Sequence, residues 1–96
     1  MAETATRTVT VNNPAGLHAR PAELFVKTAG QFEAKIEVIK NGQRVDGKSI
    51  LNILTLAAVQ GTELSLEATG PDAHQALDAL SELFARDFDE NGTVKS

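Results

Sequence analysis

The chain contains no cysteine, no tryptophan and no tyrosine among its 96 residues. Without cysteine it has neither a disulfide framework nor a thiolate zinc site. No apolar run approaches the roughly 18 residues that suggest a transmembrane helix, and the N-terminal residues lack the basic start and apolar stretch of a signal peptide. We therefore expect a cytoplasmic protein that does not insert into a membrane.

Positive charge is also scarce. Nine Lys and Arg residues stand against thirteen Asp and Glu residues, which gives a formal net charge of −4. Domains that bind nucleic acid favour basic faces and stacking aromatic side chains, so this composition argues against a nucleic-acid partner. The length suits one domain, which we place at residues 1–90, with a flexible C-terminal tail at 91–96.

Hydrophobic periodicity predicts four strands and three helices. The predicted elements are strand 6–11, helix 19–29, strand 34–40, strand 43–46, helix 50–60, strand 62–69 and a helix that follows residues 70–72. Asn41-Gly42 predicts a two-residue hairpin turn between the second and third strands. The last helix carries one apolar stripe, made of Ala73, Ala76, Leu77, Leu80, Leu83 and Phe84.

Each predicted strand has one apolar face and one largely polar face. This alternation fits an α+β fold in which an antiparallel sheet is covered by helices on one side and wet on the other. Periodicity does not choose between strand orders, because a ferredoxin-like sheet has much the same order of elements.

The stretch 16–22 combines a reactive side chain, a permanent cation and a helix start. His18 precedes the predicted helix, and Arg20 and Pro21 lie in its first turn, where proline is tolerated. The positive end of the helix dipole and Arg20 would both stabilise the negative charge of a phosphoryl group on His18. A neutral imidazole has one bare ring nitrogen, which is a nucleophile. We therefore predict that His18 carries a phosphoryl group, with an ordinary helix entry as the alternative.

Two other polar residues have plainer interpretations. His74 lies off the apolar stripe of the last helix, and we interpret it as a surface residue. Ser49 begins the second predicted helix as its N-cap. Its hydroxyl is also a candidate for regulatory phosphorylation, because a phosphate at a helix start meets free N–H groups and Lys48 beside it adds a cation.

The second predicted helix is apolar around most of its circumference, so it is either engulfed or partly exposed. We favour exposure, because a small domain with one sheet does not easily bury a short helix completely. The centre of the resulting docking patch is predicted to be Ile50, Leu51 and Leu54. Arg20 and Lys27 are predicted to form a basic rim that steers acidic partners.

The string Gly16-Leu17-His18-Ala19-Arg20-Pro21-Ala22, followed by Lys48-Ser49-Ile50, resembles the HPr family of the bacterial phosphoenolpyruvate-dependent sugar phosphotransferase system. The resemblance extends from about residue 6 to about residue 88. It implies an open-faced β-sandwich with strand order 1-4-2-3 and three helices on one face. It implies no cofactor and no metal.

The resemblance also implies partners and roles. His18 matches the histidine that Enzyme I phosphorylates on Nδ1 and that passes the group to an enzyme IIA component, and Arg20 matches the arginine that assists. Ser49 matches the serine that HPr kinase/phosphorylase modifies in many members, which slows transfer and can recruit a transcriptional regulator. The docking patch matches the apolar docking surface of the family. A monomeric carrier without substrate turnover is expected.

The chain departs from the family pattern at three places, and three alternatives stay open. Ala15 stands where some members carry an asparagine, Asp46-Gly47 is an acidic and flexible approach to Ser49, and the tail after Glu90 is longer than usual. One alternative is a carrier of the nitrogen-related phosphotransferase branch. Another is a regulatory module that acts mainly through Ser49. The third is a ferredoxin-like small-ligand binder, which would leave His18 without a purpose.

Overall fold

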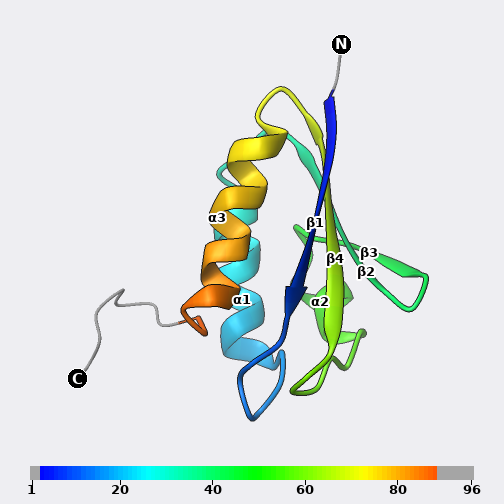
Figure 1. Cartoon of the computed structure of the whole chain (residues 1–96), viewed down its shortest axis with the longest axis vertical. Coiled ribbons are helices and arrows are strands. Elements are labelled where there is room, and N and C mark those ends of the chain that lie inside the picture. Colours follow the sequence, from blue (N-terminus) through cyan, green and yellow to red (C-terminus); the bar gives the residue numbers. More distant parts are fainter. Residues whose placement is uncertain (1–2, 89–96) are drawn as a thin grey trace.

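The computed structural model describes residues 3–88, which form a four-stranded antiparallel sheet with helices on one face (Figure 1). The elements are β1 (Glu3–Thr10), α1 (Ala19–Ala29), β2 (Lys35–Lys40), β3 (Gln43–Asp46), α2 (Ile50–Leu54), β4 (Glu63–Gly70) and α3 (Ala73–Ala85). The strands are arranged in the order β1-β4-β2-β3, as the resemblance implied. The tail predicted at 91–96 lies outside the described residues.

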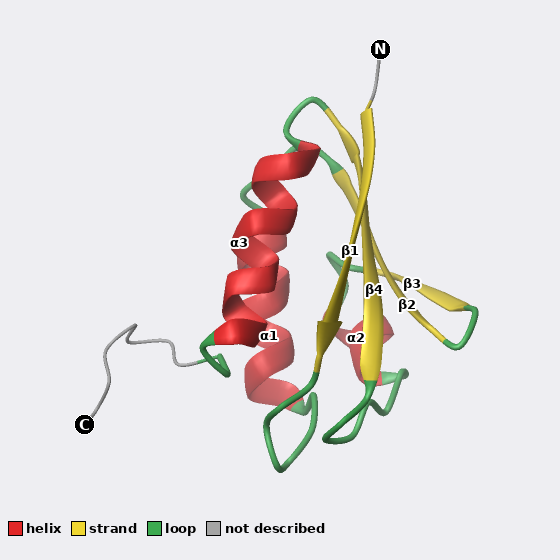
Figure 2. Cartoon of the chain, in the orientation of Figure 1, coloured by secondary structure: helices red, strands yellow, loops and turns green. Residues whose placement is uncertain are grey.

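The core lies between the sheet and the helices. α1 and α3 lie on one side of the sheet (Figure 2), and α2 packs against α1 and contributes Ile53 to the same core. Period-2 alternation turns every second strand residue toward this core, so Ile36 and Val38 in β2 and Leu64 and Leu66 in β4 are buried. All six residues of the predicted α3 stripe are buried as well. The alternation therefore identified the face of the sheet that the helices cover.

The turn between β2 and β3 has the conformation that its sequence predicts. Asn41 has φ 50° and Gly42 has φ 86°, and the hairpin turn of this type requires positive φ at both central residues. Asparagine and glycine tolerate that region better than other residues do. The register Lys40↔Gln43 leaves only these two residues in the loop.

The second helix is shorter than predicted. α2 ends at Leu54, whereas periodicity placed its end at residue 60. Beyond Leu54 the backbone leaves the α-helical conformation. The Leu56 N–H donates to the Ile53 carbonyl, three residues earlier, at 3.1 Å, and Ala57 adopts φ 49°. The Ala58 carbonyl then accepts the Leu17 N–H at 2.8 Å. This long-range contact draws an apolar segment out of the helix, which local periodicity cannot reveal.

The strand bounds differ from the prediction at their ends. β1 begins at Glu3 rather than at residue 6, because antiparallel pairing with β4 continues to the register Glu3↔Gly70. β1 also ends at Thr10, one residue early, and β2 and β4 each begin one residue late. Pairing with a neighbouring strand, rather than hydrophobic alternation, decides where these strands end.

Candidate functional site

His18 is the N-cap of α1, where the sequence placed it. Its backbone is extended (φ −88°, ψ −165°), and its carbonyl accepts the Ala22 N–H at 3.0 Å. N-cap side chains commonly accept a bond from the first helical turn, but the His18 side chain makes no such bond and is exposed. First-turn N–H groups lack intrahelical acceptors and carry partial positive charge. An accessible imidazole therefore lies beside a cluster of backbone donors.

The backbone before His18 is held by the segment that follows α2. Gly16 has φ +76°, and a Cβ atom at this position would lie 2.6 Å from the Ala58 carbonyl oxygen. Only glycine permits so close an approach in that conformation. The next residue, Leu17, is buried and donates its N–H to the same carbonyl at 2.8 Å. The position of His18 therefore depends on segment 57–59 as well as on α1.

A shallow hollow of about 290 Å³ lies against His18. Its lining residues are Ala15, Leu17, His18, Leu54, Ala57, Ala58 and Val59. His18 is the one polar side chain among these seven, so the hollow offers an apolar wall beside the imidazole ring. Val59 is 65% exposed. Its place beside His18 was not predicted, because hydrophobic periodicity placed residue 59 inside a helix.

The predicted docking patch is accessible. Leu51 is 75% exposed, and Ile50 and Leu54 are half-buried where they pack against the core. Leu54 also lines the hollow beside His18. The expectation that all three side chains are partly exposed is confirmed, and the docking role of these side chains stays a prediction.

The two residues of the predicted basic rim lie on one face of α1 but at opposite ends of the helix. Arg20 is in the first turn, and its Nη1 lies 3.4 Å from Glu23 Oε1. Lys27 is exposed in the last turn, two turns or about 10 Å along the helix axis. An exposed ion pair contributes only about 0–1 kcal/mol, so Glu23 does not immobilise the guanidinium strongly. The rim therefore combines one cation near His18 with a second farther away.

Ser49 is the N-cap of α2, as predicted. Its Oγ accepts hydrogen bonds from the Asn52 backbone N–H at 3.2 Å and from Asn52 Nδ2 at 3.1 Å. The cation expected beside it is directed elsewhere, because Lys48 Nζ donates to the Phe32 carbonyl at 2.7 Å. This contact places the start of α2 beside the C-terminal end of α1, whereas the Leu17–Ala58 contact connects the other end of α2 with the N-terminal end of α1. His18 and Ser49 are therefore separated along the two helices.

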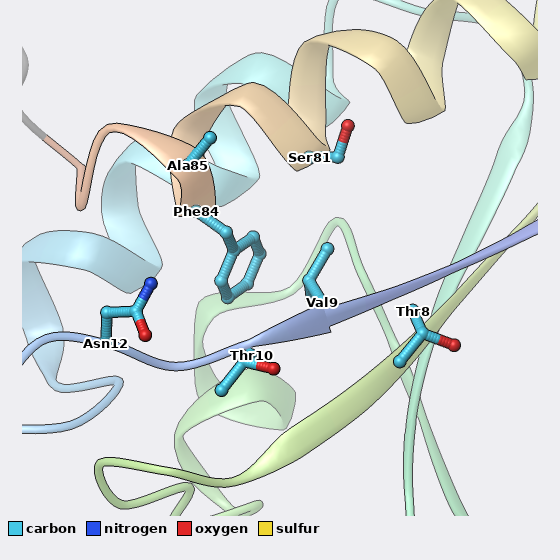
Figure 3. A pocket seen from close by; sticks show the side chains of 7 residues that line it. All are labelled: Thr8, Val9, Thr10, Asn12, Ser81, Phe84 and Ala85. Carbon is cyan, nitrogen blue, oxygen red and sulfur yellow. The ribbon is translucent and has the colours of Figure 1, made fainter.

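Another hollow, of about 310 Å³, lies between β1 and α3 (Figure 3). Its lining residues are Thr8, Val9, Thr10, Asn12, Ser81, Phe84 and Ala85. None of these side chains is titratable near neutral pH, and none is a strong nucleophile. The slightly smaller hollow beside His18 is therefore the better candidate site.

Within residues 3–88, no three His, Cys, Asp or Glu side chains gather to hold a metal ion. No helix in the same range is long and apolar enough to cross a membrane. His74 is exposed, with its Nε2 3.4 Å from Glu3 Oε2, which agrees with its interpretation as a surface residue.

Known proteins resemble this chain in sequence and in fold. The family model for the PTS HPr component phosphorylation site matches residues 5–86. The phosphocarrier protein HPr of Treponema pallidum is 45% identical over 84 residues, which are 88% of this chain and 96% of that protein. The crystal structure of HPr-C-His from Thermoanaerobacter tengcongensis has a TM-score of 0.85 and 42% identity, covering 88% of this chain and 94% of that chain. Crh, a catabolite repression protein of Bacillus subtilis described as a dimer with a swapping domain, has a TM-score of 0.71 and 39% identity, covering 82% of this chain and 91% of that chain.

Proposed function

This chain belongs to the HPr family of phosphocarrier proteins, and from that membership we propose that His18 accepts a phosphoryl group from phosphorylated Enzyme I and passes it to an enzyme IIA component of the sugar phosphotransferase system. The observation that carries the proposal is the exposed His18 side chain at the start of α1, which caps no helical N–H. The protein acts as a monomeric cytoplasmic carrier without turnover of its own, and it needs no cofactor or metal.

The transfer is a substitution at phosphorus. The lone pair of His18 Nδ1 forms the new N–P bond while the bond between phosphorus and the donor breaks, and the donor keeps that electron pair. Arg20 and the first-turn N–H groups of α1 supply positive charge near the group received. Charge-assisted hydrogen bonds are worth about 1.5–3 kcal/mol each, and the helix dipole adds about 0.3–1 kcal/mol. These amounts favour loading but still allow the group to leave for the next partner.

The decisive experiment is incubation with Enzyme I and labelled phosphoenolpyruvate. Wild-type protein should take up one acid-labile phosphate, and His18→Ala should take up none. His74→Ala is the matched control, because it removes the other exposed histidine and should label like wild type. Label on His74, or normal labelling of His18→Ala, would refute the assignment. A thermal melt should show that His18→Ala remains folded.

Arg20 is proposed to stabilise the phosphoryl group in transit. Its side chain is more than half exposed, so Arg20→Ala should slow transfer while leaving the melting temperature almost unchanged. Glu23→Ala is the control, since it removes one residue that Arg20 contacts without removing the cation. A transfer rate for Arg20→Ala equal to that of wild type would exclude Arg20 from the site.

The docking patch is proposed to contact both Enzyme I and enzyme IIA, with the basic rim of Arg20 and Lys27 steering acidic surfaces toward it. A carrier must leave each partner quickly, which calls for a small interface near or below about 1,200 Å². The position of Leu54 supports this proposal, because the side chain lies at once in the docking patch and beside His18.

Ser49 is proposed as a regulatory site for a kinase of the HPr kinase/phosphorylase type, with a transcriptional regulator as a further partner. A phosphate on Ser49 would place negative charge next to the docking patch and weaken docking there. The likeness to Crh, whose name refers to catabolite repression, favours a regulatory module as a second candidate, and Ser49 is the residue through which we propose that such a module would mainly act. The labelling experiment separates the two, because such a module would take no phosphate from Enzyme I. Transfer assays with enzyme IIA proteins of both branches would distinguish a carrier of the sugar branch from a carrier of the nitrogen-related branch.

A further inference from the structure

Lys40 occupies a position where the alternation of β2 calls for an apolar side chain. Ile36 and Val38 are buried on the core side of the sheet, and Lys40 continues the same face at the end of the strand, half-buried. A charged group removed from water needs polar partners. Lys40 Nζ meets that need by donating to the Leu56 carbonyl at 2.8 Å. The ammonium ion therefore reaches across to the segment that follows α2.

That segment forms one wall of the hollow beside His18. Leu56 is buried, and Ala57, which lines the hollow, has φ 49°. This left-handed conformation is unfavourable for a residue with a Cβ atom and persists only where the surroundings hold it. On the far side of Ala57, the Ala58 carbonyl is bound to the Leu17 N–H. The carbonyls before and after Ala57 are thus held by two separate parts of the chain.

We propose that Lys40 is a positioning residue for the His18 site, because its ammonium ion fixes the Leu56 carbonyl and thereby the 57–59 wall against which Leu17 and His18 are placed. Lys40 does not line the hollow itself, so it acts through the backbone of that wall. The kinetic part of this inference rests on the proposed phosphoryl transfer. The structural part depends only on the link from Lys40 to the Leu17 N–H.

The test compares Lys40→Met with Lys35→Met. Methionine keeps an unbranched apolar stem but loses the ammonium donor. Lys35 begins the same strand, its side chain is 75% exposed and its Nζ lies 3.7 Å from Glu37 Oε2, so Lys35→Met controls for the lost charge. Lys40→Arg keeps a cationic donor and serves as the rescue variant. Each protein is measured by amide hydrogen exchange and by steady-state transfer from Enzyme I.

In Lys40→Met we expect the Leu17 amide to exchange about threefold to tenfold faster, and KM for transfer to rise by a similar factor with kcat almost unchanged. Lys35→Met should match wild type, and Lys40→Arg should stay near it. Equal exchange at Leu17 in Lys40→Met and wild type would overturn the proposal. Faster exchange of amides throughout the protein would also overturn it, because Lys40 would then support the fold in general. Absence of transfer in wild type would refute the proposed function, and the Leu17 comparison would still decide the role of Lys40.

Discussion

Polar side chains near the two ends of α1 differ in whether they bind the backbone. At the C-terminal end, the Asp72 carboxylate accepts two backbone N–H groups of loop 31–34 at 2.9 and 3.0 Å, and Lys48 donates to a carbonyl of the same loop at 2.7 Å. At the N-terminal end, the His18 side chain caps no N–H group and remains exposed. Polar groups that meet backbone partners stabilise the fold, whereas the His18 imidazole stands on a well-held backbone and remains accessible.

The backbone is held tightly at both ends, but by different means. A Cβ atom on Gly70 would lie 2.8 Å from the Ala34 Cα, so the C-terminal end of α1 also depends on a close approach. There the charged side chain of Asp72 reinforces the contact. At the N-terminal end, the Gly16–Ala58 approach and the Leu17 N–H hold the chain without using the His18 side chain. This difference leaves the imidazole accessible without loosening the backbone that supports it.

The largest expected effect comes from breaking the backbone support at the His18 end. Gly16→Ala adds a Cβ atom 2.6 Å from the Ala58 carbonyl oxygen at φ +76°. We expect a loss of about 2–4 kcal/mol in the free energy of unfolding, from backbone strain together with the steric clash. Gly42→Ala is the control, because Gly42 has φ +86° but nothing within 4 Å of a Cβ atom, so it should lose only about 1–2 kcal/mol. Equal losses in urea titrations would show that the approach to Ala58 contributes nothing.

The next effect tests whether the functional surface extends from the His18 end along α2. Leu51→Glu should weaken binding to Enzyme I and to enzyme IIA at least tenfold, because burying one leucine side chain contributes about 1.5–3 kcal/mol. The melting temperature should hardly move, since Leu51 is 75% exposed. Gln75→Glu makes the same charge change at an exposed position of α3 and should bind normally. Unchanged binding of Leu51→Glu would exclude the docking patch, and a collapsed melt would place Leu51 in the core.

A smaller effect is expected at Ser49, whose hydroxyl stabilises the start of α2, whereas the His18 imidazole is proposed to carry the phosphoryl group. Ser49→Ala removes the acceptor for the Asn52 N–H and should lower the free energy of unfolding by about 1 kcal/mol, with transfer from Enzyme I unchanged. Ser49→Asp keeps a cap acceptor, so its stability should stay near wild type while transfer slows. Chemical denaturation and transfer kinetics on both variants provide the measurements. If Ser49→Asp transferred at the wild-type rate, the regulatory role would be lost.

The smallest effect concerns pH at the C-terminal end of α1. The Glu33 N–H, and then the Ala34 N–H, hold the pKa of Asp72 below its ordinary value. The unfolded chain therefore binds this proton at a higher pH than the folded chain does. The stabilisation is fully present above the ordinary pKa of about 3.9, and it is lost as pH falls through the lower folded value.

Asp72→Asn should therefore flatten the acid limb of the curve of stability against pH. His18→Ala should leave that limb unchanged, because the carboxylate and its backbone partners are intact. Urea titrations at a series of acidic pH values compare the two variants. An acid limb for Asp72→Asn as steep as that of wild type would assign the acid sensitivity to other carboxylates.

Much of the fold and of the site was predictable because the signals are local. Alternation identified the buried face of each strand, Asn41-Gly42 specified its turn, and the string around His18 located the start of α1. Ser49 was predictable as an N-cap for the same reason, since the cap bond spans three residues. Such features depend on backbone conformation and side-chain spacing within one or two turns, which the order of the amino acids determines by itself.

Only the tertiary structure decided three features. These are the residue at which α2 ends, the hydrogen-bond acceptor of Lys48, and the hydrogen-bond acceptor that allows Lys40 to lie on the core side of β2. In each case the partner is a backbone group far along the chain: Leu17 N–H for Ala58, the Phe32 carbonyl for Lys48 and the Leu56 carbonyl for Lys40. A backbone carbonyl has the same chemistry at every residue, so no sequence pattern distinguishes the one that will be nearby. The packing of helices on the sheet makes that choice, and it placed Val59 beside His18 in the same way.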